Sequence, residues 1–184
     1  MSTQILVIAL VIMGIISVGA MFLERKDIHP ISKGSLLKYG GMTVIFFIVI
    51  CLFMYSCSLV GLTSSNGLST DLNAPLWYLF LYVAVFSPIL EEFLFRFVMF
   101  KFLKFMAGPK TEVRVTETVS IVTSAFIFGM VHQGGLVQNI YAFSMGIVFG
   151  CVYAKEKNIL VTTYMHFLFN SITMIIFTVG MCLS

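Results

Sequence analysis

Six polar residues interrupt otherwise apolar stretches of this sequence, and their types suit proton-transfer chemistry. Ionisable groups are costly in an apolar environment and usually face a partner or a cavity. A carboxylate beside an imidazole can take a proton from water and hold it, while a second imidazole and an amide can stabilise an oxyanion. This set suits attack of water on an amide bond, although a Glu with two His could instead bind a metal ion. The six are Glu91, Glu92, Arg96, His132, His166 and Asn170.

Helical spacing sorts these residues into pairs. Residues four apart share a helix face, so Glu92 can pair with Arg96, and His166 projects beside Asn170. Glu91 points about 100° away from Glu92 around a helix and needs a different partner. Phe128 and His132 repeat the four-residue spacing. Each feature also has a plainer interpretation, in which the Glu92–Arg96 pair is a structural brace, a single intramembrane His is a packing residue, and Phe128 belongs to the core.

The composition shows what must position these groups. Of the 184 residues, 59% are hydrophobic and 10% are charged, whereas soluble domains carry about 25% charged residues. A water-soluble globule, a disordered chain, a nucleic-acid-binding module and a disulfide-rich secreted domain are therefore excluded. At roughly 20 residues per membrane crossing, we expect an all-α, polytopic membrane helix bundle of about six helices, forming a single membrane domain over residues 1–184. The cysteines are expected to be small buried hydrophobes: Cys51, Cys57, Cys151 and Cys182.

Six apolar stretches predict the transmembrane helices. The first favours a retained helix over a signal peptide, because no basic residue precedes it. Pro88 predicts a kink in the third, and the fourth is short enough to suggest a re-entrant segment. The stretches cover residues 5–23, 41–62, 75–100, 118–131, 137–154 and 159–183.

The charged residues predict the topology. The first, third and fifth connections between the stretches contain Lys or Arg, and the second and fourth contain neither. With six crossings all basic connections share one face, which the positive-inside rule makes cytoplasmic, and both termini then lie outside. At about 1.5 Å per helical residue, Glu91, His132, His166 and Asn170 fall near mid-membrane, so we expect a shared polar cavity. His29, in the first connection, is expected to be an ordinary solvated histidine.

Three motifs resemble those of the CPBP intramembrane proteases, a family that includes CAAX prenyl proteases and bacteriocin-processing or immunity (Abi-type) proteins. Residues 91–96 fit EExxxR, residues 128–132 fit FxxxH, and residues 166–170 fit HxxxN. The match runs from about residue 88 to 173, so we divide the domain into two amino-terminal helices (1–74) and a CPBP-like catalytic core (75–184).

The resemblance implies roles for these residues. Glu91 would be the general base that activates water together with His132, and His166 and Asn170 would stabilise the oxyanion. Glu92, Arg96 and Phe128 would support them. The cofactor is either none or a single zinc ion, whose ligands would be Glu91, His132 and His166.

The function expected from these arguments is that of an intramembrane endopeptidase in a bacterial plasma membrane. Its partners would be the lipid bilayer and a membrane-associated peptide or protein substrate, with no nucleic acid. A secreted peptide precursor or bacteriocin leader fits better than a prenylated CAAX protein, since bacteria generally lack protein prenylation. The alternatives are a non-catalytic bacteriocin immunity or regulatory protein of the same fold, and a proton or ion pathway.

Overall fold

The protein is an integral membrane protein built from helices. The computed structural model describes residues 3–23, 25–26, 28–62, 74–108, 112–132 and 134–183, and no strand occurs among them. Six helices are long and apolar enough to cross a bilayer, which confirms the predicted all-α bundle. Five of them are α1 (Thr3–Leu23), α2 (Lys33–Leu59), α6 (Val113–Val131), α7 (Gly135–Glu156) and α8 (Ile159–Leu183).

The remaining span, Leu76–Ala107, is one long helix made of five segments; we call it the third helix. It alternates between α-helical and π-helical geometry along its length. The segments are α3 (Leu76–Phe80), the π-helical η1 (Leu81–Phe86), α4 (Ser87–Glu92), the π-helical η2 (Phe93–Met99) and α5 (Phe100–Ala107).

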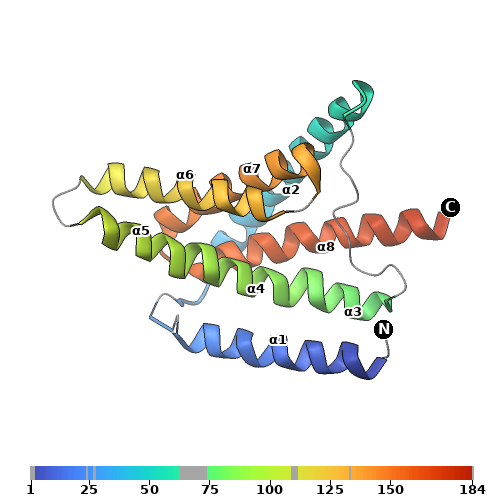
Figure 1. The fold of residues 1–184 in the computed structure, drawn as a ribbon, viewed down its shortest axis with the longest axis horizontal. Helices are drawn as coiled ribbons and strands as arrows, with labels where there is room; N and C mark the ends of the chain where they lie inside the picture. Colours follow the sequence, from blue (N-terminus) through green and yellow to red (C-terminus); the bar gives the residue numbers. More distant parts are fainter. Residues whose placement is uncertain are drawn as a thin grey trace.

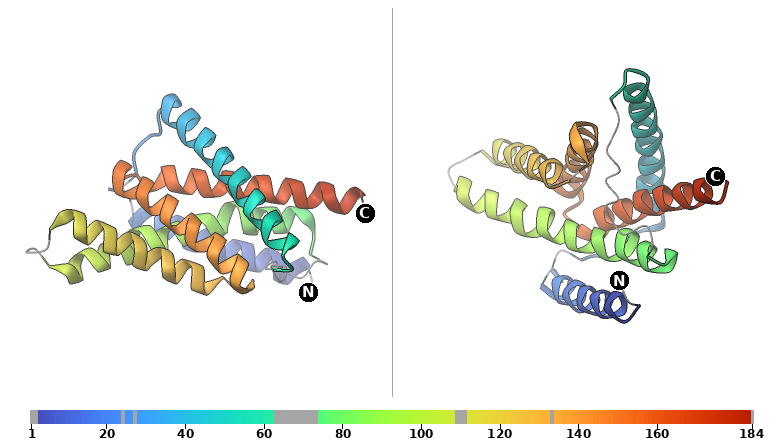
Figure 2. Two further views of the ribbon diagram at one scale, coloured as in Figure 1. Left: turned by 90° about the horizontal axis from the view of Figure 1, so that it is seen from above. Right: turned by 45° about the vertical axis from the view of Figure 1, so that its right-hand side comes forward.

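The third helix and α8 form the centre of the bundle. Helix α8 contacts η1, α4 and η2 along the length of the third helix. The α6–α7 hairpin packs beside η2, α5 and α8, while α1 lies along η1 and α4 (Figure 1). Helix α2 contacts α8 and α7 and runs steeply across α8 (Figure 2). The two amino-terminal helices thus lie on the outside of the arrangement.

Three predicted boundaries were wrong in the same way. The second span begins at Lys33 and not near residue 41. The fourth span is a 19-residue helix that begins at Val113 and not near residue 118, so it is long enough to cross the membrane. The third span continues to Ala107 instead of ending near residue 100. In all three cases basic residues were taken as connections. Long Lys and Arg side chains can bury their stems along a helix and extend their charges to the interface, so they do not end a span.

Near Pro88 the third helix changes from π-helical to α-helical geometry. A proline lacks an N–H and its ring clashes with the carbonyl four residues earlier. The chain accommodates both effects by forming the π-helical turn η1 immediately before α4, where Pro88 occupies the first turn. The predicted disturbance at Pro88 is therefore a local widening of the helix, and the helix continues beyond it (Figure 1).

Helices α6 and α7 pack closely because small residues face each other. A Cβ atom added to Gly146 would lie 2.7 Å from the Cα atom of Ala125, and one added to Gly129 would lie 2.8 Å from the backbone oxygen of Asn139. Small residues let helix backbones approach in membranes, where packing and not hydrophobic burial holds helices together. This contact fixes the end of α6, where His132 is located.

The basic connections gather at one end of the bundle, as the charge pattern predicted (Figure 1). The amide of Asn158 donates to the carbonyl oxygen of His29 (2.8 Å), and its oxygen accepts from the His29 N–H (3.3 Å). Glu117 on α6 accepts a hydrogen bond from Lys157 Nζ (2.6 Å) and lies 3.5 Å from Lys104 Nζ. The His29 side chain is exposed, as expected. These contacts tie the first connection to the fifth, and the fifth to α5 and α6 through Glu117.

The prediction for the cysteines was wrong at two positions. Cys51 and Cys151 are exposed on the outside of the bundle, and Cys57 is half-buried. In a membrane an outward helix face is as apolar as the interior, so sequence hydropathy does not separate the two environments. The side chain of Cys182 lies outside the described residues.

Candidate active site

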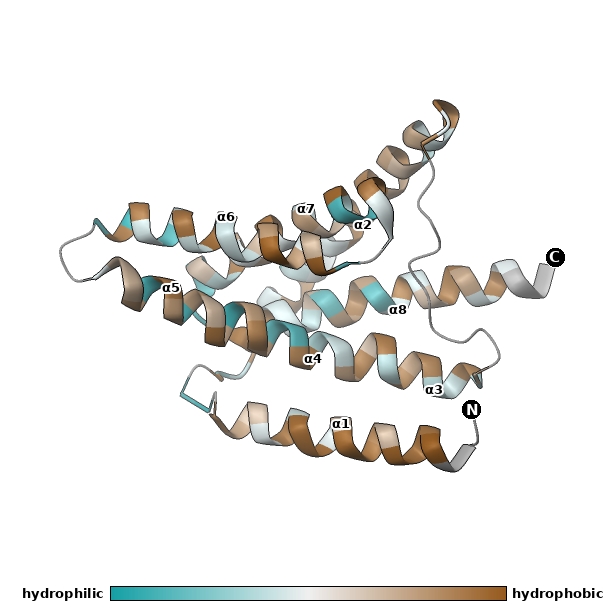
Figure 3. Cartoon of the chain, in the orientation of Figure 1, coloured by the Kyte–Doolittle hydropathy of each residue, from teal (hydrophilic) through white to brown (hydrophobic). Residues whose placement is uncertain are grey.

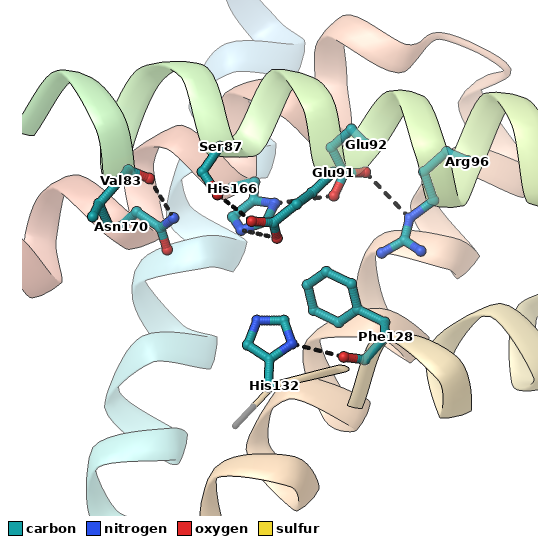
Figure 4. Close-up of polar contacts among 9 residues, drawn as sticks. All are labelled: Val83, Ser87, Glu91, Glu92, Arg96, Phe128, His132, His166 and Asn170. Atoms are coloured by element: carbon teal, nitrogen blue, oxygen red, sulfur yellow. Dashed lines mark hydrogen bonds and ion pairs between the residues drawn. The ribbon is translucent and has the colours of Figure 1, made fainter. Parts of the chain in front are cut away.

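Glu92 is the buried centre of a polar cluster between the third helix and α8. Its side chain and that of Arg96 have no exposed surface, and Arg96 Nε lies 3.2 Å from Glu92 Oε2, as the four-residue spacing predicted. On the opposite side, Glu92 Oε1 lies 3.1 Å from His166 Nδ1 (Figure 4). Thr162, one turn before His166, is also buried, and its hydroxyl donates to the backbone oxygen of Ile159 (3.1 Å). One carboxylate thus holds side chains from both helices.

Glu91 faces a different set of partners, as its position on the helix predicted. Its Oε1 accepts a hydrogen bond from the hydroxyl of Ser87, one turn earlier (Figure 4). Its Oε2 lies 3.7 Å from His166 Nε2, and the Glu91 side chain keeps 27% of its surface exposed. Since 3.7 Å is longer than a direct hydrogen bond, the carboxylate and the imidazole face each other but are not hydrogen-bonded.

His166 is held between the two neighbouring carboxylates. The ring is almost fully buried, with Nδ1 toward Glu92 and Nε2 toward Glu91. The Phe149 and Phe128 rings pack against it, with centroid distances of 5.4 Å and 6.1 Å. Glu92 accepts the Nδ1 hydrogen bond, which orients Nε2 toward Glu91.

His132 approaches from α6 and packs on Phe128. Its Nδ1 lies 2.7 Å from the backbone oxygen of Phe128, and the two rings are 4.5 Å apart. A carbonyl oxygen accepts hydrogen bonds only, so Nδ1 carries a hydrogen and Nε2 of the neutral ring is the free acceptor. Phe128 also lies 5.7 Å from the Arg96 guanidinium. This one aromatic residue therefore separates His132 from the buried ion pair.

Asn170 lies one turn beyond His166 on α8. Its Nδ2 donates to the backbone oxygen of Val83 in η1 at 2.8 Å (Figure 4). An amide nitrogen has two hydrogens, so the second one is not committed by this bond. The carboxamide thus faces the third helix two turns before Glu91.

The structure brings most of the predicted site residues together on two helices. Glu91, Glu92 and Arg96 of the third helix meet His166 of α8, while Asn170 contacts the same helix at Val83 and His132 lies across the same region on Phe128 (Figure 4). In the described part of the chain, no three His, Cys, Asp or Glu side chains lie close enough to hold a metal ion. As arranged here, Glu91, His132 and His166 do not fit a three-ligand zinc site.

Sequence reasoning missed several supporting residues. Ser87 lies four residues before Glu91 and Thr162 four before His166, so the same spacing rule would have found both. Asn139, with its amide turned so that nitrogen faces the carbonyls, donates to the backbone oxygens of His132 and Gly135. Asn139 thereby ties the start of α7 to the end of α6. No periodicity in the sequence points to Asn139, because its partners are backbone atoms.

The family follows from comparison with known proteins. The family model for "Type II CAAX prenyl endopeptidase Rce1-like" proteins matches residues 73–172, more than half of the chain. The chain belongs to this family. This confirms the resemblance to CPBP intramembrane proteases, and the matched region contains all three motifs. The motif residues that face one another in the structure are thus those that define the family resemblance.

One curated relative also matches part of the chain. The membrane-embedded CAAX protease MroQ of Staphylococcus aureus (strain USA300) is 31% identical over 94 residues, which make up 51% of this chain and 37% of MroQ. The chain therefore spans little more than a third of the length of this relative. No solved structure matches the chain.

Proposed function

We propose that this chain is an intramembrane endopeptidase that cleaves a membrane-associated peptide or protein with a water molecule activated by Glu91. Family membership supports the protease class. The observation that carries the proposal is the pairing of an unbonded carboxylate oxygen with an imidazole: Glu91 Oε2 is buried without a hydrogen-bond partner and lies 3.7 Å from His166 Nε2. This separation leaves both groups free to contact a water molecule or a substrate carbonyl.

In the proposed reaction Glu91 takes one proton from water as the water oxygen attacks the carbonyl carbon of the scissile amide. Glu91 then delivers this proton to the leaving nitrogen, and the C–N bond breaks. His132, whose Nε2 is the free acceptor of its ring, would hold the remaining hydrogen of the attacking water. No covalent intermediate with the protein is needed.

The oxyanion would be stabilised by His166 and Asn170. Asn170 has a second amide hydrogen besides the one bonded to Val83. His166 could donate from Nε2 when its ring carries both hydrogens. Glu92 and Arg96 would keep His166 in place and take no part in proton transfer, because both are fully buried and paired.

The substrate and the membrane setting are part of the same proposal. We expect residues 75–184 to form the catalytic core and residues 1–74 to be an accessory pair of helices. We place the protein in a bacterial plasma membrane with its basic connections in the cytoplasm and both termini outside. The substrate would be a secreted peptide precursor or a bacteriocin leader and not a prenylated protein.

The test is cleavage of a peptide library by the purified, reconstituted protein, read by mass spectrometry. Glu91→Gln preserves size and removes the base, so cleavage should fall by at least about 100-fold. Glu117→Gln is a matched control, because it makes the same change at an ion pair distant from the site. Wild-type rates for Glu91→Gln would refute the role of Glu91. Parallel reactions with a chelator test whether the reaction depends on a metal ion.

The competing function, immunity by binding alone, predicts a different outcome for the same variant. Cells producing Glu91→Gln and challenged with a bacteriocin would remain protected if binding is sufficient. Loss of protection with normal protein levels in the membrane would tie protection to the chemistry of Glu91.

A further inference from the structure

One backbone carbonyl of the third helix has no donor from its own helix. In an α-helix the carbonyl of Val83 would accept from the N–H of residue 87, and in a π-helix from that of residue 88. The Ser87 N–H is directed to the carbonyl of Tyr82, and Pro88 has no N–H. Both regular donors are therefore lost at this position.

Asn170 of α8 supplies the donor that is lost. Its Nδ2 lies 2.8 Å from the Val83 oxygen. In a membrane an unsatisfied backbone carbonyl is unfavourable, and side chains of neighbouring helices often satisfy carbonyls freed by proline. The neighbours Ala84 and Pro88 are buried, so the protein itself must provide the partner here.

This bond lies in register with the other contacts between the two helices. On α8, Asn170 follows His166 by one turn, so both residues contact the third helix from one face. On the third helix, Val83 precedes Ser87 by one turn, and Ser87 in turn donates to Glu91. The Val83–Asn170 bond therefore fixes the third helix against α8 just before the carboxylate.

We propose that Pro88 and Asn170 are a matched pair of positioning residues. Pro88 frees the Val83 carbonyl, and Asn170 binds it, which sets the rotation of the third helix and thus the place of Glu91 beside His166. The pair is defined by hydrogen bonding alone and does not require the protein to be a peptidase. Only the activity measurement below rests on the proposed function.

The test is a double-mutant cycle on the full-length protein in detergent, with thermal unfolding as the readout. Asn170→Leu leaves the carbonyl unsatisfied and should lower the melting temperature by about 2–4 °C. Pro88→Ala restores an N–H at residue 88 that can bond to Val83, so Asn170→Leu should cost less than half as much in that background. Thr173→Val is the matched control, because the Thr173 hydroxyl bonds within α8 to Phe169; its effect should add to that of Pro88→Ala.

Additive effects of Pro88→Ala and Asn170→Leu would overturn the proposal. If neither Asn170→Leu nor Asn170→Asp folds alone, recovery of folded protein on adding Pro88→Ala supports the pairing, and failure to recover it refutes the pairing.

Cleavage kinetics give the readout that a purely stabilising role would not change. Pro88→Ala should keep the melting temperature but lower kcat by about 10-fold or more at unchanged KM, because it misplaces Glu91. An unchanged kcat would contradict the positioning role. Absence of cleavage by the wild-type protein would refute the proposed function and leave the thermal cycle valid.

Discussion

The first two helices differ from the last four in how much of their surface is buried within the protein and in how apolar they are. Only 22% of α1 and 11% of α2 are buried within the protein, against 33–44% for the four later spans. Yet α1 and α2 are the most apolar of the six, and α1 carries little of the polar colour that marks the third helix and α8 (Figure 3). Apolar residues are placed here for contact with lipid, and polar residues for contact between helices.

This contrast indicates which contacts hold the helices in a defined arrangement. Lipid is as apolar as a hydrophobic side chain, so burial alone does not drive helices together in a bilayer. The later helices associate through the Glu92 cluster and through close packing at Gly146. Helix α1 contributes Leu6 and Leu10 to a small apolar cluster with Tyr78 and Met174. Substitutions should therefore matter most where helices exchange polar or backbone contacts.

The largest loss of stability should follow Glu92→Ala. Removing one partner of a buried ion pair leaves Arg96 uncompensated and should cost about 3–5 kcal/mol, measured by unfolding in a mixed detergent series. Replacing both partners, with Glu92→Leu and Arg96→Met, should cost less because no charge remains buried. A double variant as unstable as Glu92→Ala would show that the pair itself is not the source of the stability.

Two glycine variants compare the core with the lipid-facing helix directly. Gly146→Ala should destabilise the protein by about 1–3 kcal/mol, because the new Cβ meets the backbone of Ala125 on α6. Gly19→Ala on α1 should be neutral or slightly stabilising, since a Cβ there has no neighbour within 4 Å. The same unfolding assay serves both. Equal effects would remove the distinction between the two regions.

Helix α1 itself provides a smaller contrast between its two faces. Leu10 is buried and Ile12 is 51% exposed. Leu10→Ala should cost only about 1 kcal/mol, less than in a water-soluble core, because packing is lost while the residue remains out of water. Ile12→Ala should have almost no effect on unfolding. A cost for Ile12→Ala equal to that of Leu10→Ala would mean that its face contacts protein.

The smallest effect is expected at the ends of the bundle. Glu117→Gln removes an acceptor of Lys157, whose side chain is half-exposed. Exposed ion pairs contribute at most about 1 kcal/mol and are screened by salt. The difference from wild type should therefore shrink between low and high ionic strength. A salt-independent loss would indicate that Glu117 has a structural role between the connections.

The sequence predicted the number of spans and the pairing of the motif residues, because both follow from simple periodicities. Hydropathy located six stretches, and four-residue spacing paired Glu92 with Arg96. It did not predict η1 and η2, because no periodicity of residue types marks a π-turn. Nor did it locate Asn158, whose carboxamide joins two connections 129 residues apart through backbone atoms of His29. Contacts to backbone atoms leave no pattern of residue types.

The π-helical segment η1 has a consequence for the adjacent pair Glu91 and Glu92, which follow it. Consecutive residues differ by about 100° around a helix axis, so a shift in phase of one residue would change which carboxylate faces Arg96 and which faces Ser87. A π-turn holds one additional residue and thereby sets this phase for everything that follows it. The Glu92 side chain has no exposed surface, and the Glu91 side chain retains 27%. Two chemically identical side chains thus acquire different surroundings through the winding of the helix that carries them.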